Sequence, residues 1–280
     1  MKQVKLAKRI VFNNSKIIRP LVLATGLLIS ASTYNFAQNL TMLNPSFESY
    51  IQCPTGLTPP GGTMIISNWI QTTNSTSDYF NSNCSFLPAN MSSIWPYSNA
   101  TAANGNGFLG MFMEVSNPAV FTNNPGYKEY VTNTLSGPMV AGKVYKISFK
   151  VRVLSGTASN GTQYGAIPLA ERGYLGLLFT AANPRNTYAS IDQAIPANYF
   201  PNQRTYIPAS HAAYTSTNGW TSVELNYTAQ GGEQFMTLGQ FRVGASSNYG
   251  FNREAYYFFD DFSTVQEVTC SAGNVAPVIN

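Results

Sequence analysis

Charged side chains are scarce in this sequence: Asp, Glu, Lys and Arg make up only 10% of its 280 residues, and histidine occurs once. The single His211 cannot build a multi-histidine metal site, and no nucleophile motif surrounds it that would complete a Ser-His-Asp triad. A glycine-rich nucleotide loop is also lacking. These absences predict a protein that is not an enzyme. A glycan-active hydrolase is the third alternative, because two carboxylates could come from Glu114, Glu171, Glu224 or Glu233.

The apolar run at 20–30 is shorter than the roughly 20 residues that a membrane-spanning helix needs. Six basic residues precede it, and Ala37 follows as a small residue before a polar start. This order is typical of a secretory signal peptide. We therefore expect residues 1–37 to be cleaved after Ala37 rather than kept as a membrane anchor. The mature protein is expected to be secreted or held at the cell surface, with no segment inserted in a membrane.

Positive charge is also lacking once the expected signal peptide is removed. The whole chain has 16 Lys and Arg against 12 Asp and Glu, and the segment 1–37 holds six of the basic residues. The mature chain therefore has 10 basic and 12 acidic side chains, a net charge near −2. A basic patch with interleaved aromatic residues, of the kind that binds DNA or RNA, is not present. We expect no nucleic acid partner.

Cysteine is rare, with three residues in the chain. Cys53 and Cys84 both lie in loop sequence rich in Pro, Ser, Asn and Gly, and an exported protein meets an oxidising environment. These two cysteines could pair, which would close a loop of about 30 residues and stabilise the fold by roughly 3–4 kcal/mol. Cys270 is left over in the C-terminal tail, either free or available to a partner or a further domain.

Aromatic and turn-forming residues are abundant instead: the chain has 17 Tyr, 17 Phe, 22 Gly and 16 Pro. Residues 143–154 alternate apolar and polar side chains, which indicates a strand with one buried and one solvated face. Further strands or short apolar segments are expected at 39–49, 64–70, 107–115, 127–135, 174–180, 220–229, 233–243 and 255–268.

These segments are not separated by any convincing helix. Parallel strands need crossover connections, which are usually helices, so we expect antiparallel pairing. The sequence predicts an all-β fold, namely an antiparallel two-sheet β-sandwich of the jelly-roll kind, over residues 38–268. Residues 269–280 are expected to be a C-terminal tail or linker.

Two adjacent carboxylates, Asp260 and Asp261, stand inside the aromatic run "YYFFDDF" at 256–262. In a strand they point to opposite faces, so one can meet solvent or a loop while the other faces inward. A buried carboxylate needs a cation, a hydrogen-bond network or a proton. Calcium suits such a position because it takes carboxylate and carbonyl oxygens in loose geometry. A further acid, Glu48, lies in "NPSFES" at the end of the first strand.

The order of these motifs resembles galactose-binding-like jelly rolls, a fold that includes many carbohydrate-binding modules. "NPSFES", a tryptophan some twenty residues on, and "YYFFDDFSTV" carry the likeness. Within that group the chain is similar to secreted surface proteins of gliding Bacteroidetes, through "NPSFE…CPTG…NW…DYFN" and "GWTSVELNYTAQGGEQFMTLGQF", over roughly residues 39–266. The resemblance implies a structural calcium ion that joins the first strand to the last, here through Glu48 and Asp260 or Asp261.

Sugar binding in such folds generally uses exposed aromatic rings together with polar hydrogen-bonding groups. The candidates are aromatic residues in polar loops: Trp95, Tyr97, Tyr79 with the neighbouring Asp78, and a second set around Tyr249. The polar face of 143–154 could also line a groove for an acidic glycan, through Lys146, Lys150 and Arg152, although such a face is more often simply solvated.

The leading interpretation is a secreted, non-catalytic binding module for a polysaccharide or a cell-surface glycan. The alternative is a structural or adhesive spacer domain of a surface protein, with no sugar ligand. Further domains or surface partner proteins are compatible with either interpretation.

Overall fold

The computed structural model describes residues 37–59, 63–91, 96, 98–115, 126–191, 194–196, 199–244 and 253–268. The expected signal peptide, apart from Ala37, and the expected tail with Cys270 lie outside these residues. Within the part of the chain that the structure describes, no helix is long and apolar enough to cross a membrane. The architecture below concerns the unit that begins at Ala37.

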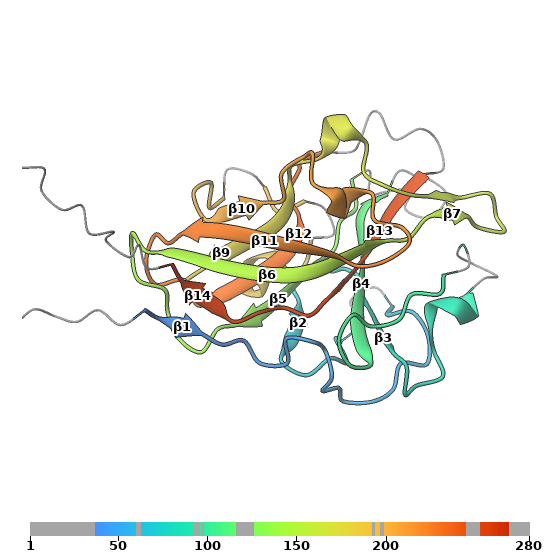
Figure 1. Ribbon diagram of the computed structural model, residues 1–280, viewed down its shortest axis with the longest axis horizontal. Helices are drawn as coiled ribbons and strands as arrows, with labels where there is room; N and C mark the ends of the chain where they lie inside the picture. The colour runs from blue at the N-terminus through green and yellow to red at the C-terminus, as the bar shows by residue number, and fades with distance from the viewer. Residues whose placement is uncertain are drawn as a thin grey trace, which may run out of the picture. The chain divides into compact units, whose positions relative to one another are not determined.

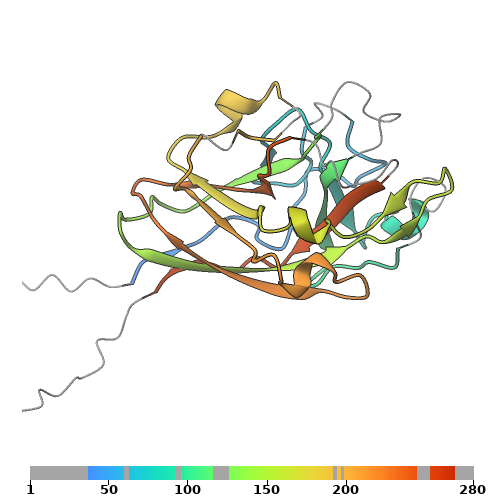
Figure 2. The ribbon, with the colours of Figure 1, turned by 90° about the horizontal axis from the view of Figure 1, so that it is seen from above.

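Two β-sheets form this unit, and nearly all strand pairs are antiparallel (Figures 1 and 2). The strands of the larger sheet follow the order β1 (Asn39–Leu40), β14 (Val265–Glu267), β6 (Val144–Val153), β13 (Arg253–Asp260), β4 (Gly107–Val115) and β3 (Asp78–Asn81). Three more strands join it: β11 (Thr221–Thr228) on β6, and the short pair β7 (Gly156–Thr157) and β8 (Gln163–Tyr164). The smaller sheet has the order β10 (Arg204–Tyr206), β9 (Leu175–Thr180), β12 (Phe235–Gln240), β5 (Tyr130–Thr134) and β2 (Trp69–Gln71).

The predicted all-β, two-sheet sandwich is confirmed. One pair departs from the antiparallel rule, because the short β8 runs parallel to β13. The helices are a single turn each: α1 (Arg185–Tyr188) and the 3₁₀ helices η1 (Pro88–Met91), η2 (Leu169–Glu171) and η3 (Ala212–Tyr214). In the segment 39–49, expected as a first strand that runs into a turn at Asn44, only β1 forms a strand, followed by an isolated bridge between Met42 and Leu135. The chain then turns, with positive φ angles at Asn44 and Phe47.

The alternation in 143–154 is confirmed in β6. Its inward residues Tyr145, Ile147, Phe149, Val151 and Val153 lie in the main core between the sheets. Its outward residues Lys146, Ser148 and Lys150 are partly exposed. Strand β11 pairs with β6 from Thr221 opposite Val151 to Thr228 opposite Val144, and Figure 1 shows the two strands side by side.

Strands β4 and β13 are buried on both faces, which explains the aromatic run in β13. Tyr257 and Phe259 point into the main core, whereas Tyr256 and Phe258 belong to a second cluster on the outer face of the larger sheet. Loop residues cover this second cluster, so β4 and β13 lack the solvated face that is usual for antiparallel strands. Alternating side chains of one strand therefore fill two separate apolar layers.

The outer face of the smaller sheet is covered as well. Tyr188 and Ile195, from the segment between β9 and β10, form a third cluster with Tyr130, Leu178 and Phe241. The unit therefore contains one central core and two lateral clusters.

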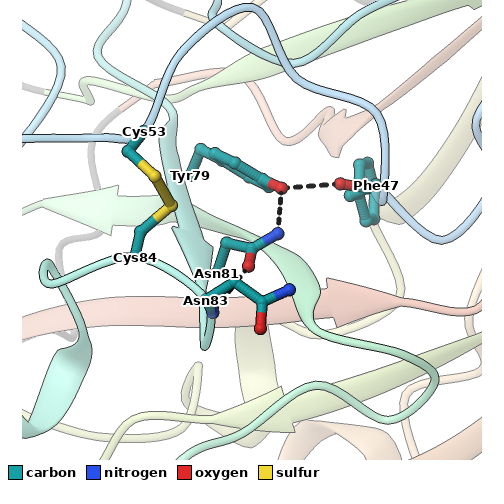
Figure 3. The surroundings of a disulfide bond; sticks show 6 residues. All are labelled: Phe47, Cys53, Tyr79, Asn81, Asn83 and Cys84. Carbon is teal, nitrogen blue, oxygen red and sulfur yellow. Dashed lines mark hydrogen bonds between the residues drawn. A yellow bond between two sulfur atoms is a disulfide. The ribbon is translucent and has the colours of Figure 1, made fainter.

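The predicted disulfide between Cys53 and Cys84 is present, with 5.6 Å between the Cα atoms (Figure 3). It joins the loop after Phe47 to the turn after β3. Beside it, the hydroxyl of Tyr79 donates to the carbonyl of Phe47 at 2.8 Å and accepts from Asn81 Nδ2 at 2.7 Å. The bridge therefore fixes the first loop of the unit against strand β3.

Candidate functional site

The paired acids in "YYFFDDF" hold the loop at 98–107 onto the larger sheet. Asp260 is the last residue of β13 and is fully buried. Its Oδ2 accepts hydrogen bonds from the backbone N–H groups of Ala103 at 2.7 Å and Asn104 at 2.9 Å. Its Oδ1 accepts from the N–H of Asp261 at 2.6 Å. A buried carboxylate needs a cation, a hydrogen-bond network or a proton, and the structure shows a hydrogen-bond network around Asp260.

Asp260 is buried and Asp261 is partly exposed, but strand alternation does not extend to Asp261. Strand β13 ends at Asp260, and Asp261 takes a left-handed conformation with φ of 54°. Alternation requires extended backbone, so it stops at this residue. The side chain of Asp261 instead accepts a hydrogen bond from Asn104 Nδ2 at 3.0 Å, and both carboxylates reach the same loop.

Glu48 reaches the other end of this loop. Its Oε1 accepts from the N–H groups of Asn106 at 2.8 Å and Gly107 at 2.7 Å. Gly105 between them has φ of +71°, and a Cβ at this position would lie 2.4 Å from Glu48 Oε1. Only glycine fits there, because it permits the left-handed backbone and leaves room for the carboxylate. We call Glu48, Asp260 and Asp261, with the loop residues 103–107 that they bind, the acidic clip.

The acidic clip connects the chain near its first strand to the end of β13 through the loop 103–107, and its observed contacts are with amide hydrogens. Calcium would require oxygen ligands around it, whereas the bonded carboxylate oxygens face N–H donors. Among the described residues, no three His, Cys, Asp or Glu side chains gather as a metal site would need. The clip therefore needs no metal ion to explain its contacts, and calcium binding stays a prediction.

Burial raises the pKa of Asp260 from its ordinary 3.8 to about 7, while the hydrogen bonds from Asn104, Asp261 and Ala103 act in the opposite direction. The free energy of removing the carboxylate from water outweighs the bonds that it gains. A weakly acidic group therefore lies at the centre of the clip.

A pocket of about 450 Å³ opens beside the same loop. Its walls come from three separate segments: residues 98–99 before the clip, residues 152–155 at the end of β6, and residues 217–218 before β11. Most of the lining side chains are polar, namely Ser98, Asn99, Arg152, Ser155, Thr217 and Asn218. We call this cavity the Arg152 pocket.

Arg152 is the charged residue of the pocket and is only 9% exposed. It lies opposite Phe258 of β13 on the outer face of the larger sheet. Its Nη2 donates to Asn99 Oδ1 at 2.7 Å, which connects β6 to the loop. Further along this loop, Trp220 Nε1 donates to the carbonyl of Thr101 at 2.9 Å. The acidic clip, Arg152 and Trp220 together hold the loop that forms one wall of the pocket.

The predicted sugar-binding residues Asp78 and Tyr79 are not in an exposed loop, and this expectation is corrected. Both lie in strand β3 and are 2% and 1% exposed. Asp78 accepts hydrogen bonds from Thr58 N and from the hydroxyl of Tyr256, each at 2.8 Å. Strand β3 pairs with β4 and is covered by the disulfide loop, so neither side chain can stack on a ligand.

The other predicted binding residues, Trp95, Tyr97 and Tyr249, lie outside the described residues. Pro96, which separates the first two in sequence, is described and buried. It packs near the Arg152 pocket, because a Cβ at Gly156 would lie 2.8 Å from Pro96 Cβ. Gly156 directly follows the lining residue Ser155.

Exposed aromatic residues that the sequence interpretation missed occur elsewhere. Tyr174 is 43% exposed and Tyr199 is 47% exposed, in segments where aromatic residues could equally have been core. Arg152 itself was considered only as part of the polar face of β6. The sequence signal for the pocket was limited to that arginine in an alternating strand, since the other walls come from distant loops.

The carboxylates that could have served a hydrolase all have structural partners. Glu114 pairs with the buried Lys128 at 2.8 Å, and Glu224 pairs with the exposed Lys146 at 3.3 Å. Glu233 accepts hydrogen bonds from the N–H groups of Gln230 and Gly231 in the turn before β12.

The two remaining enzyme candidates also have structural contacts. Glu171 lies 3.8 Å from Arg242. Nδ1 of His211 accepts from Ala213 N at 3.1 Å and caps the 3₁₀ helix η3.

Comparison with known proteins gives weak structural likeness and no family. No protein-family model matches the sequence, and no curated protein is detectably similar to it. The chain aligns with the solved structure of TmCBM61 in complex with β-1,4-galactotriose, at 13% identity and a TM-score of 0.31, over 81% of this chain and 97% of that chain. It also aligns with the K1 cleaved adhesin domain of Lys-gingipain from Porphyromonas gingivalis W83, at 11% identity and a TM-score of 0.33, over 84% and 99% of the two chains.

Likenesses of this size do not transfer a ligand or a partner. The relation to surface proteins of gliding Bacteroidetes stays a prediction.

Proposed function

We propose that this chain is a secreted or cell-surface carbohydrate-binding module without catalytic activity, and that its ligand binds in the Arg152 pocket. The observation that carries the proposal is the lining of that pocket. Hydroxyl, amide and guanidinium groups from three distant segments converge on one open cavity. Sugars present many hydroxyl groups in fixed directions, and a set of convergent polar groups is what fixes the orientation of such a ligand.

The size and rigidity of the pocket support this proposal. Its volume of about 450 Å³ lies within the range of roughly 300–1,000 Å³ that is usual for small-molecule sites. Strand β6 supplies one wall, and the acidic clip holds the loop that supplies another. Walls that are already in place lower the entropy that binding would otherwise cost.

Affinity electrophoresis through gels that contain single polysaccharides tests the proposal. We expect a panel of plant, algal and animal polysaccharides to include at least one that retards the protein. The double variant Asn99→Ala and Asn218→Ala should remove most of that retardation, because both amides line the pocket. Asn226→Ala is the matched control, since Asn226 is an exposed amide of β11 that does not line this pocket.

Each outcome is informative. Retardation that the double variant leaves unchanged would place the sugar site elsewhere, and Trp95→Ala and Tyr97→Ala would then test the neighbours of Pro96. No retardation on any polysaccharide would overturn the proposal and favour the spacer alternative.

A further inference from the structure

The charge around the Arg152 pocket is one-sided. Among the described residues that line the cavity, Arg152 is the only charged one. Within the described part of the chain, no carboxylate lies within ion-pair distance of its guanidinium group. A cation that is nine-tenths buried normally has an anionic partner, because burial without one costs several kcal/mol.

The neighbouring acids are already bonded to other groups. Asp260 lies two residues after Phe258 in β13. Its carboxylate accepts hydrogen bonds from the backbone N–H groups of Ala103, Asn104 and Asp261. Glu224, on the adjacent strand β11, pairs with Lys146. The next cation along β6, Lys150, donates to Ser222 Oγ at 2.7 Å. Among the described residues, Arg152 therefore brings a positive charge to the pocket that no ion pair neutralises.

The guanidinium group is also held in place. The hydrogen bond from Nη2 to Asn99 Oδ1 uses one of its five N–H donors and fixes the plane of the group against the loop. A planar arginine fork matches the two oxygens of a carboxylate or a sulfate, and bonds of this kind are about twice as strong as neutral ones. Ser98, Ser155, Thr217 and Asn218 stand around it with groups suited to hydroxyls.

From this arrangement we propose that the pocket selects acidic sugars, whose carboxylate or sulfate group pairs with Arg152 while the neighbouring side chains bind the hydroxyl groups. This inference rests on the proposed function, since it names the class of glycan that the same site takes. It assigns Arg152 as the residue that determines specificity.

Isothermal titration calorimetry of the full chain tests this inference with three polymers. Polygalacturonate is the first anionic probe, and its carboxyl-reduced counterpart is a neutral polymer with the same linkages. A sulfated galactan is the second anionic probe. We expect binding to at least one anionic polymer, and affinity for the neutral polymer at least tenfold lower than for polygalacturonate or undetectable. Arg152→Gln should reduce affinity for the anionic polymer at least tenfold, whereas Lys146→Gln, outside the pocket on the same strand, should change it less than twofold.

A second variant keeps the test valid if Arg152→Gln does not fold. Asn218→Asp places a carboxylate at the rim of the pocket on an exposed residue, so the fold should tolerate it. It should weaken binding of the anionic polymer at least tenfold by like-charge repulsion. Asn226→Asp, the same change on β11 away from the pocket, should have less than a twofold effect.

The outcomes separate the two proposals. Equal binding of the neutral and anionic polymers, or anion binding that Arg152→Gln and Asn218→Asp leave unchanged, would overturn the acidic-sugar inference and leave the binding module intact. Failure to bind any polysaccharide would overturn the proposed function itself.

Discussion

The substitution Asp260→Asn tests whether burial or hydrogen bonding controls the carboxyl group at the centre of the acidic clip. Asparagine has nearly the same shape, and its amide oxygen can accept the N–H groups of Ala103 and Asn104, but it cannot ionise. Any difference in pH dependence between the two proteins therefore reports the ionisation of Asp260.

The expected magnitude follows from the pKa. Burial raises the pKa of Asp260 from 3.8 to about 7 in the folded protein. Between these values the folded protein keeps a proton that the unfolded chain has lost, so the free energy of unfolding falls as pH rises. One proton contributes about 1.4 kcal/mol per pH unit, and the interval of about three units gives a loss of about 4 kcal/mol. Well below the ordinary pKa of 3.8 both states are protonated, and the stabilisation is complete.

Urea denaturation of both proteins at unit steps from pH 4 to pH 8, with tryptophan fluorescence as the signal, measures this loss. Trp69 is 2% exposed in the folded protein, so unfolding changes its environment strongly. Burial also raises the pKa of Glu129 to about 7, but Glu129 is present in both proteins and its effect cancels in the difference. We expect the wild type to lose about 4 kcal/mol relative to Asp260→Asn between pH 4 and pH 8.

Two results would refute this reasoning. A constant difference between the two proteins would show that the pKa of Asp260 is not raised. A wild type that gains stability with rising pH would show that the three N–H donors outweigh burial, as in carboxylates whose pKa falls below about 2 when they accept two or three backbone hydrogen bonds.

Three further predictions concern the disulfide, a buried ion pair and the clip. Replacing Cys53 and Cys84 by serine should lower the free energy of unfolding by about 4 kcal/mol, because the bridge closes a separation of 31 residues; a loss below about 1 kcal/mol in urea denaturation would contradict this. Lys128→Met removes the cation that pairs with the buried Glu114 and should lower the free energy of unfolding by about 3–5 kcal/mol. The double variant with Glu114→Gln should recover much of this loss. Equal stability of the single and double variants in the same assay would disprove the pairing. Chelation with EDTA should lower the melting temperature, because the resemblance implies a calcium ion at the acidic clip and an ion that binds only the folded state stabilises it; a melting temperature that EDTA leaves unchanged would contradict this.

Local patterns were sufficient to predict the parts of the fold that depend on neighbouring residues. The alternation in 143–154 identified β6, because ten consecutive side chains alternate between a buried and a more exposed face. The two cysteines in loop sequence identified the disulfide. The sequence also predicted that Asp260 needs a partner, because burying a carboxylate in an aromatic strand costs free energy unless another group binds it.

Contacts between distant segments were not predictable in the same way. The partner of Asp260 is a loop more than 150 residues earlier in the chain, and its donors are backbone N–H groups that have no sequence signature. Strand β3, "DYFN", has polar ends that favour a loop, and it becomes buried only through pairing with β4 and the cover of the disulfide loop. Glu114 of β4 pairs with the distant Lys128, and the register of β4 against β13 shifts beside Ala255. Neither feature can be read from alternation.

The pairing of β1 with β14 has a mechanical consequence. Asn39 lies opposite Gln266, and Gln38 N donates to Glu267 Oε2 at 2.9 Å, so the chain enters and leaves the sandwich at the same end of one antiparallel pair. Tension applied between these two points would load the β1–β14 hydrogen bonds in unzipping geometry, so they would break one after another. In shear geometry they would break all at once. Under tension β1 would separate from the sheet first, and the Tyr145 ring would be among the first core groups to become exposed to water.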